Sequence, residues 1–118
     1  MAKVAVTGGA GFIGSNLTRR LISEGHEVVV VDDLSTGLIS NVDQAETTFH
    51  QVSITDAKAL HVALKDCQTI IHLAARGSVP RSIKNPVATH DVNATGTLNV
   101  LEVARESGAH VIFSSSSS

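Results

Sequence analysis

The 118-residue chain contains no tyrosine and no tryptophan. These residues therefore offer no phenol hydroxyl for proton transfer. Apolar residues nevertheless make up 42% of the chain, a share typical of a folded protein and too high for a disordered one. The length allows one domain at most, and it is enough to bury a small core.

Cysteine occurs once, as Cys67, so these residues cannot form an internal disulfide. This agrees with the reducing cytosol, and we expect a cytoplasmic protein. Cys67 follows Asp66 and has no neighbouring cation that would lower its pKa and make it reactive. We therefore interpret Cys67 as a thiol that packs in the interior.

Basic runs and long apolar runs are also missing from the sequence. The formal net charge of -2 predicts no attraction to nucleic acid. The longest apolar run, at 28–31, is far too short to cross a bilayer, and residues 1–9 show no secretory signal. The six histidines are scattered without metal-ligand spacing, so we expect no metal site.

Short β-branched runs alternate with helical patterns along the chain. The run at 27–32 is apolar nearly throughout, which is typical of a strand buried on both faces of a parallel sheet. Ile13, Leu17 and Leu21 recur at helical spacing and predict one apolar helix face. The expected strands are Lys3–Thr7, Glu27–Asp32, Thr47–Val52, Thr69–Ala74 and His110–Ser114, and the expected helices are Phe12–Ser23, Ala57–Lys65 and Pro86–Glu106.

This alternation predicts an α/β fold with a Rossmann-type parallel sheet. We expect about five strands in the order 3-2-1-4-5, right-handed crossovers and helices on both faces. That order corresponds to one mononucleotide-binding half and part of a second.

A glycine-rich turn lies between the first strand and the first helix. It contains Gly9-x-Gly11-x-x-Gly14, and Gly8 extends it on the strand side. Glycines let the chain turn sharply, let the backbone approach a pyrophosphate, and let the helix pack closely on the strand. The N–H groups and dipole at the helix N-terminus then favour phosphate.

Asp32, at the end of the next strand, completes a dinucleotide-binding pattern. A carboxylate there accepts hydrogen bonds from both ribose hydroxyls of an adenosine and repels a 2′-phosphate, so we predict NAD over NADP. Ser35 and Thr36 follow closely, and their hydroxyls are candidates to bond the adenosine end. Each of these features has an alternative without a ligand. The glycine turn can be a tight strand-to-helix turn, Asp32 can be a solvated acid, and 33–37 can be an ordinary polar turn.

A second candidate region is the loop at 77–82, which follows the fourth predicted strand. Open α/β sheets bind ligands at the carboxyl ends of their strands, so Ser78 and Val79 are candidate substrate contacts. The alternative is a loop without that role. His72 lies near the end of the same strand, and we interpret it as a structural histidine rather than a base.

Several longer motifs now support a resemblance. The sequence is similar to the extended short-chain dehydrogenase/reductase family of NAD-dependent epimerases and dehydratases, and most to its nucleotide-sugar 4-epimerases of the UDP-glucose 4-epimerase type. The resemblance covers essentially the whole chain and rests on the segments TGGAGFIGS, VVDDLSTG, IIHLAARGSVPRSIKNP, DVNATGTLNVLEVAR and FSSS.

The resemblance implies a role for each matching residue. Ser116 would be the catalytic serine that bonds the reacting sugar hydroxyl. The residues implied to bind NAD are Gly8, Gly11, Phe12, Ile13 and Gly14 at the pyrophosphate, Asp32, Asp33, Ser35 and Thr36 at the adenosine, and Leu73, Ala74, Ala75 and Asn93 along the cofactor.

The chain also departs from the family pattern. Ser53-Ile54 stands where an Asp-Ile or Asp-Leu pair usually meets the adenine, so only the Ile54 backbone is left for that contact. Arg76 stands where glutamine is common, and both a phosphate contact and a solvated side chain are open for it. The family transfers protons with a Tyr-x-x-x-Lys pair beyond the serines, and this chain has no tyrosine.

We therefore expect residues 1–118 to be an incomplete NAD-binding domain. Truncation before the later strands and the C-terminal substrate domain would leave the chain inactive by itself. The implied reaction is isomerisation of a UDP-sugar in carbohydrate metabolism, and a homodimer through the long helix or self-association at the sheet edge is expected. The alternatives are a stand-alone NAD-binding or regulatory module, or part of a nucleotide-sugar dehydratase, decarboxylase or reductase.

Overall fold

A computed structural model of the chain describes residues 3–34, 40, 46–73 and 95–113. Five parallel strands form one sheet in the order β3-β2-β1-β4-β5, as the sequence predicted. The elements are β1 (Lys3–Thr7), α1 (Phe12–Ser23), β2 (Glu27–Asp32), β3 (Thr47–Gln51), α2 (Ala57–Ala63), β4 (Thr69–His72), α5 (Gly96–Ser107) and β5 (His110–Phe113).

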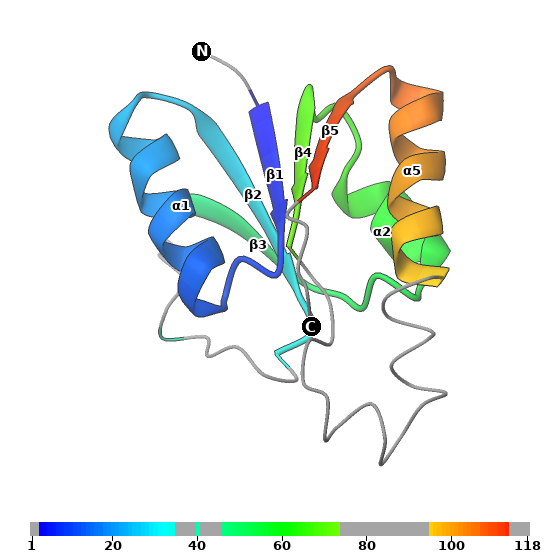
Figure 1. Cartoon of the computed structure of the whole chain (residues 1–118), viewed down its shortest axis with the longest axis horizontal. Helices are drawn as coiled ribbons and strands as arrows, with labels where there is room; N and C mark the ends of the chain where they lie inside the picture. Colours follow the sequence, from blue (N-terminus) through cyan, green and yellow to red (C-terminus); the bar gives the residue numbers. More distant parts are fainter. Residues whose placement is uncertain (1–2, 35–39, 41–45, 74–94, 114–118) are drawn as a thin grey trace.

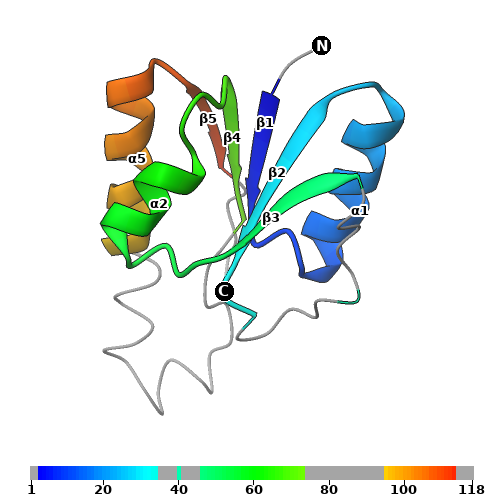
Figure 2. The ribbon, with the colours of Figure 1, turned by 180° about the vertical axis from the view of Figure 1, so that it is seen from behind.

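Helices cover both faces of the sheet, with α1 on one side and α2 and α5 on the other (Figure 1, Figure 2). Successive residues of a strand point to opposite faces, and the core divides accordingly. Val6, Val28 and Val30 pack toward partly buried Leu21 and Ile22 of α1. On the other face, the larger cluster contains Ala5, Val29, Val31, Ile54, Leu60, Ala63, Leu64, Cys67, Ile70, Val100, Val103 and Ala104.

The buried face of α1 agrees with the predicted one at Leu17 and Leu21, which are half-buried, and differs from it in the first turn. Ile13 is 65% exposed, whereas Gly14, Ser15 and Thr18 are the buried residues of this helix. The first turn of α1 lies against the glycine turn, where only small residues fit, and the Thr18 hydroxyl donates to the Gly14 carbonyl at 2.7 Å. Close backbone packing therefore overrides the apolar periodicity at this end of the helix.

The helix ends follow known capping chemistry. At the end of α1, Gly25 adopts φ 86°, and its N–H donates to Ile22 O at 3.0 Å while the N–H of His26 donates to Leu21 O at 3.1 Å. These two bonds form a Schellman motif. The Asp56 carboxylate caps α2 by accepting from Ala59 N at 3.1 Å.

Three predicted boundaries differ from the structure, at the ends of α2, β3 and β4, where the described Leu73 already lies outside the strand. Helix α2 ends at Ala63 rather than Lys65, since the backbone turns at Asp66 with φ 67°. Strand β3 ends at Gln51, one residue earlier than predicted. Strand β4 ends at His72, and the described part of the long helix is α5, because the predicted residues 86–94 lie outside the described ranges, as do residues 74 and 114.

Strand β5 lies at one end of the sheet and pairs only with β4 among the described residues. Ile112 and Phe113 remain 52% and 48% exposed. This agrees with the prediction of an open sheet edge, whose backbone groups are available for pairing.

Candidate functional site

The glycine turn connects the carboxyl end of β1 to the N-terminus of α1. Its backbone begins with Gly8 at φ 75°, a conformation that favours glycine. The N–H of Gly8 donates to Val31 O at 2.7 Å, and that of Gly11 donates to Gly8 O at 3.1 Å. These bonds fix the turn to β2 and close it on itself.

The glycines of this turn are needed for different reasons. A Cβ on Gly14 would lie 2.3 Å from Gly8 O, and one on Gly9 would lie 2.6 Å from Cγ1 of Val30. Both positions are therefore closed by the chain itself. Among the residues that the structure describes, a Cβ on Gly11 would meet only Gly8 O at 3.4 Å, an ordinary contact. The protein's own packing leaves room at Gly11, as expected where a backbone must admit a ligand.

The N-terminus of α1 faces this turn without a side chain to cap it. Gly11 is the N-cap, and the first turn contains no acidic residue. The first N–H groups of a helix have no acceptor within the helix, and they carry about half a positive charge. The arrangement is suited to an anionic group such as a pyrophosphate.

Asp32 organises the turn from the end of β2. Its Oδ2 accepts from Ala10 N at 2.9 Å, and its Oδ1 accepts from Leu34 N at 2.8 Å. The side chain is only 8% exposed. A carboxylate accepts about four hydrogen bonds, so acceptor capacity remains for the two hydroxyls of a ribose. Asp32 thus joins the glycine turn to the end of β2, where the sequence predicts an adenosine ribose.

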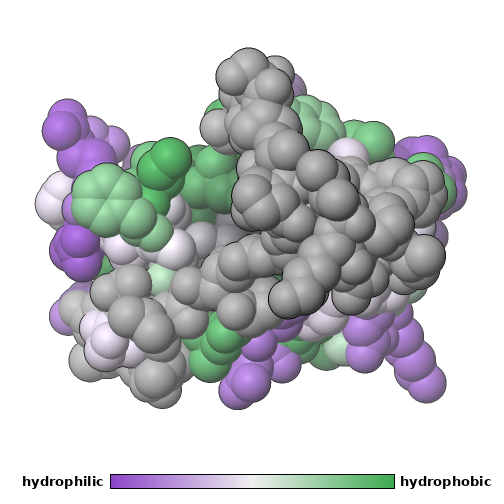
Figure 3. All heavy atoms as spheres, turned by 60° about the horizontal axis from the view of Figure 1, so that its bottom comes forward, coloured by the Kyte–Doolittle hydropathy of each residue, from purple (hydrophilic) through white to green (hydrophobic). Residues whose placement is uncertain are grey.

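Two large apolar side chains stand at the same place. Phe12 is 81% exposed and Ile13 is 65% exposed, although both follow the glycine turn directly. Apolar surface is visible among hydrophilic side chains on the view of this end of the molecule (Figure 3). Exposed apolar residues beside a helix N-terminus provide contact area for the uncharged parts of a ligand.

The structure gives a local account of Ser53 and Ile54. The Ile54 side chain is buried and fills the space over Gly96, where a Cβ would come within 2.4 Å of its Cδ1. The Ile54 carbonyl accepts from Asn99 Nδ2 at 2.8 Å. The Ser53 hydroxyl lies 2.7 Å from that of Thr55. Of the backbone polar groups of Ile54, the N–H is therefore the one left for the predicted adenine contact.

His72 occupies the middle of the carboxyl end of the sheet. Its Nδ1 lies 2.7 Å from Thr7 Oγ1, and its Nε2 lies 3.0 Å from Thr97 Oγ1. Burial lowers the pKa of His72 below its ordinary value of 6.5. A buried, neutral imidazole with two hydroxyl partners agrees with the interpretation of a structural histidine. The sequence placed His72 on a strand but gave no signal for these partners.

The remaining predicted site residues divide into two groups. Asp33 is exposed and Leu73 is half-buried, and both lie at the carboxyl ends of their strands. The others lie outside the described residues: Ser35, Thr36, Ala74, Ala75, Arg76, Ser78, Val79, Asn93 and Ser116.

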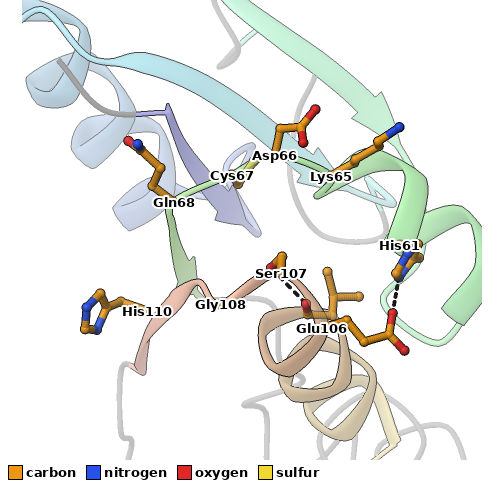
Figure 4. Close-up of a pocket in the computed structure, with 10 residues that line it drawn as sticks. His61, Lys65, Asp66, Cys67, Gln68, Glu106, Ser107, Gly108 and His110 are labelled. Atoms are coloured by element: carbon orange, nitrogen blue, oxygen red, sulfur yellow. Dashed lines mark hydrogen bonds and ion pairs between the residues drawn. The ribbon is translucent and has the colours of Figure 1, made fainter.

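A hollow lies at the opposite, amino end of the sheet. It is a hollow of about 660 Å³ between the C-terminal ends of α2 and α5 and the residues before β4 and β5. Figure 4 shows His61 of α2 pointing toward Glu106 of α5, and His61 Nδ1 lies 3.2 Å from Glu106 Oε2, a contact that is an ion pair when the imidazole is protonated. Cys67 also borders the hollow, and burial raises its thiol pKa, which agrees with a packing role.

Within the described ranges, no group of three or more His, Cys, Asp or Glu side chains is arranged to hold a metal ion. In the same part of the chain, every helix is too short or too polar to cross a lipid bilayer.

Comparison with known proteins gives consistent results. A model described as the NAD dependent epimerase/dehydratase family matches residues 4–118. UDP-glucuronic acid decarboxylase 1 of Danio rerio is 38% identical over 117 residues, which are 98% of this chain and 27% of that protein.

Two solved structures show the same likeness. The crystal structure of a Thermotoga maritima UDP-glucose 4-epimerase with UDP-glucose is 37% identical, with a TM-score of 0.92 over 97% of this chain and 38% of that one. A Thermus thermophilus UDP-glucose 4-epimerase in complex with NAD is 39% identical, with a TM-score of 0.85 over 91% of this chain and 35% of that one. The chain thus spans 27 to 38% of the length of these three proteins.

Proposed function

The chain belongs to the NAD-dependent epimerase/dehydratase family, and from this premise we propose that it is the NAD-binding part of a nucleotide-sugar 4-epimerase. The proposed substrates are UDP-glucose and UDP-galactose or their N-acetylated equivalents, and the proposed location is the cytoplasm. The observation that carries the proposal is the joint geometry of Gly11 and Asp32. Open space at a glycine and a nearby buried carboxylate fit the two ends of an adenosine diphosphate.

The described residues divide the work of binding NAD. The turn at Gly8 to Gly11 and the uncapped start of α1 hold the pyrophosphate with backbone N–H groups. Asp32 accepts from the ribose hydroxyls, and its negative charge disfavours a 2′-phosphate. Phe12 and Ile13 cover the ligand with apolar surface and keep water from it.

When bound there, NAD would supply reversible hydride transfer at C4 of the sugar. In this chain, Ser116 is the residue proposed to bond the reacting hydroxyl, and Ser78 and Val79 are proposed to touch the sugar. Proton transfer requires the tyrosine and lysine of the family, and these 118 residues contain no tyrosine. We therefore expect the chain to bind NAD without turning over a sugar.

Two observations test this proposal. Incubating the purified chain with NAD and UDP-glucose should give no UDP-galactose, and measurable turnover would contradict the need for a tyrosine. The coding sequence beyond Ser118 gives the second. A Tyr-x-x-x-Lys pair there supports part of an enzyme, whereas an immediate stop codon supports a stand-alone NAD-binding module.

A second candidate function is decarboxylation of a UDP-uronic acid. It is favoured by the 38% identity to the Danio rerio decarboxylase, which covers nearly the whole chain. The same NAD site would serve both reactions. Release of carbon dioxide from UDP-glucuronic acid by a longer gene product, without interconversion of UDP-glucose and UDP-galactose, would select this function.

We also propose that the chain self-associates, through the open edge of β5 or through the long helix. The exposed side chains of Ile112 and Phe113 belong to an edge strand that, among the described residues, pairs with β4 alone. Light scattering on the purified chain tests this. A strictly monomeric, highly soluble chain would contradict it.

A further inference from the structure

His72 takes no part in the binding of NAD described above. This residue ends β4 and is 6% exposed. In the sheet register it lies between Thr7 of β1 and Phe113 of β5. Its ring meets that of Phe113 edge-on, with centroids 5.7 Å apart and an angle of 87° between the planes. One imidazole thus contacts the last residues of both neighbouring strands.

The Thr7 hydroxyl has a further role beside the bond to His72. The N–H of Leu73 donates to Thr7 Oγ1 at 3.0 Å and to the Thr7 carbonyl at 3.1 Å. Thr7 also precedes Gly8 directly, where the glycine turn begins. A single threonine therefore holds both segments that leave the sheet toward the proposed NAD site.

The other side of the imidazole faces a different element. Nε2 of His72 is bonded to the hydroxyl of Thr97 in the first turn of α5, on the side of the sheet away from α1. A neutral imidazole has one donor and one acceptor nitrogen, so it can bridge two hydroxyls, each of which donates or accepts as required. Burial disfavours the charged ring and supports this neutral bridge.

We propose that His72 is a positioning residue for NAD: through Thr7 it fixes the glycine turn and the exit of β4, while its bond to Thr97 only anchors α5. This rests on the proposed NAD site. The two ring nitrogens therefore have separable consequences. Loss of the Nδ1 bond disturbs ligand geometry, and loss of the Nε2 bond affects stability alone.

Two substitutions separate the nitrogens. In His72→Asn the amide takes the place of Nδ1 and keeps the bond to Thr7, whereas in His72→Gln it takes the place of Nε2 and keeps the bond to Thr97. Thr97→Val is the matched control, because it removes the second hydroxyl without touching Thr7. Urea unfolding and calorimetric titration with NAD are measured on the complete 118-residue chain.

All three variants are expected to unfold at lower urea concentration than the wild type. His72→Gln should bind NAD about tenfold more weakly, the effect of one well-placed hydrogen bond. His72→Asn and Thr97→Val should keep the wild-type dissociation constant within about twofold, a difference near the precision of such comparisons. Equal dissociation constants for all three variants, or weaker binding by Thr97→Val, would overturn the positioning role.

Failure of the proposed function has a different signature, since the wild-type chain itself would then bind no NAD. If His72→Gln does not fold, amide hydrogen exchange of the wild type replaces it. NAD should slow exchange at Leu73, whose N–H bonds to Thr7, more than at Val103 in the middle of α5. Equal slowing at both amides, or none at Leu73, would overturn the inference.

Discussion

The two ends of the sheet present two different arrangements of polar groups. The hollow at the amino end has a volume of about 660 Å³, and charged side chains such as Lys65 and Glu106 border it. At the carboxyl end, the candidate site consists of a glycine turn, a helix N-terminus and the buried carboxylate of Asp32. At the amino end, exposed charged side chains of two helices border the hollow. At the carboxyl end, the polar groups are backbone N–H groups and a carboxylate held in fixed positions.

We therefore look for the functional site where polar groups are held in fixed positions, and not where a hollow is large. The side chains of His61 and Glu106 are each 52% exposed, and water screens their attraction. Asp32 accepts two backbone N–H groups while buried, so its position is set before any ligand arrives. NAD binding should therefore depend on the carboxyl end of the sheet and not on the hollow at its amino end.

The largest effect is expected for Gly14→Ala, where the added Cβ would meet Gly8 O at 2.3 Å. The start of α1 must then move, which should lower the free energy of unfolding by about 3 kcal/mol. Gly11→Ala is the matched control and should cost less than about 1 kcal/mol, because only N-cap preference is lost. It should nevertheless abolish NAD binding. Urea unfolding and NAD titration are measured on both variants. If Gly11 served only the fold, Gly11→Ala would lose stability and still bind NAD.

Asp32→Asn should reduce NAD affinity about tenfold, or 1.4 kcal/mol, because a charged acceptor for the ribose becomes a neutral one. Preference for NAD over NADP should shrink at the same time, since the charge that repels a 2′-phosphate is gone. Glu27, at the other end of β2, gives the control. Glu27→Gln should bind both dinucleotides like the wild type, and equal losses in the two variants would contradict a local role for Asp32.

A smaller effect is expected from pH. The pKa of folded His72 lies below its ordinary value of 6.5, so the unfolded chain takes up a proton more readily. Stability should therefore fall as the pH drops from about 7 to 5, and the loss should be smaller in His72→Asn. Urea midpoints at several pH values measure this. Identical pH profiles of stability for His72→Asn and the wild type would show that His72 binds its proton equally well in the folded and the unfolded chain.

The smallest effect is expected at the amino end. Glu106→Gln removes the ion pair with His61 and should change the free energy of unfolding by less than about 0.5 kcal/mol. NAD affinity should stay unchanged, because the hollow lies at the far end of the sheet. A clear loss of NAD affinity would show that the two ends of the sheet are coupled and would contradict the proposed difference between them.

Much of the fold was accessible from the sequence. Near-continuous valines at 28–31 predicted a central strand, and the glycine turn followed by Asp32 predicted the site. The exposed Ile13 was missed, because packing of Gly14 on the turn decides which face of α1 is buried. Such close backbone contacts leave no mark in hydrophobic periodicity.

The hydrogen-bond partners of Asp32 and His72 could not be predicted from the sequence either. Ala10 and Thr7 meet these side chains across strands that are distant in sequence, at separations of 22 and 65 residues. Residue type suggests that a buried acid or histidine needs partners, but only the sheet register names them. The sequence therefore predicted the candidate site but not the hydrogen bonds within it.

We propose that the carboxyl end of this sheet binds NAD through the glycine turn and Asp32. Calorimetric titration of the wild-type chain with NAD and with NADP decides whether it does. We expect NAD to bind at one site per chain and NADP to bind at least about tenfold more weakly. Failure to bind NAD, or equal or tighter binding of NADP, would refute this role of the glycine turn and Asp32.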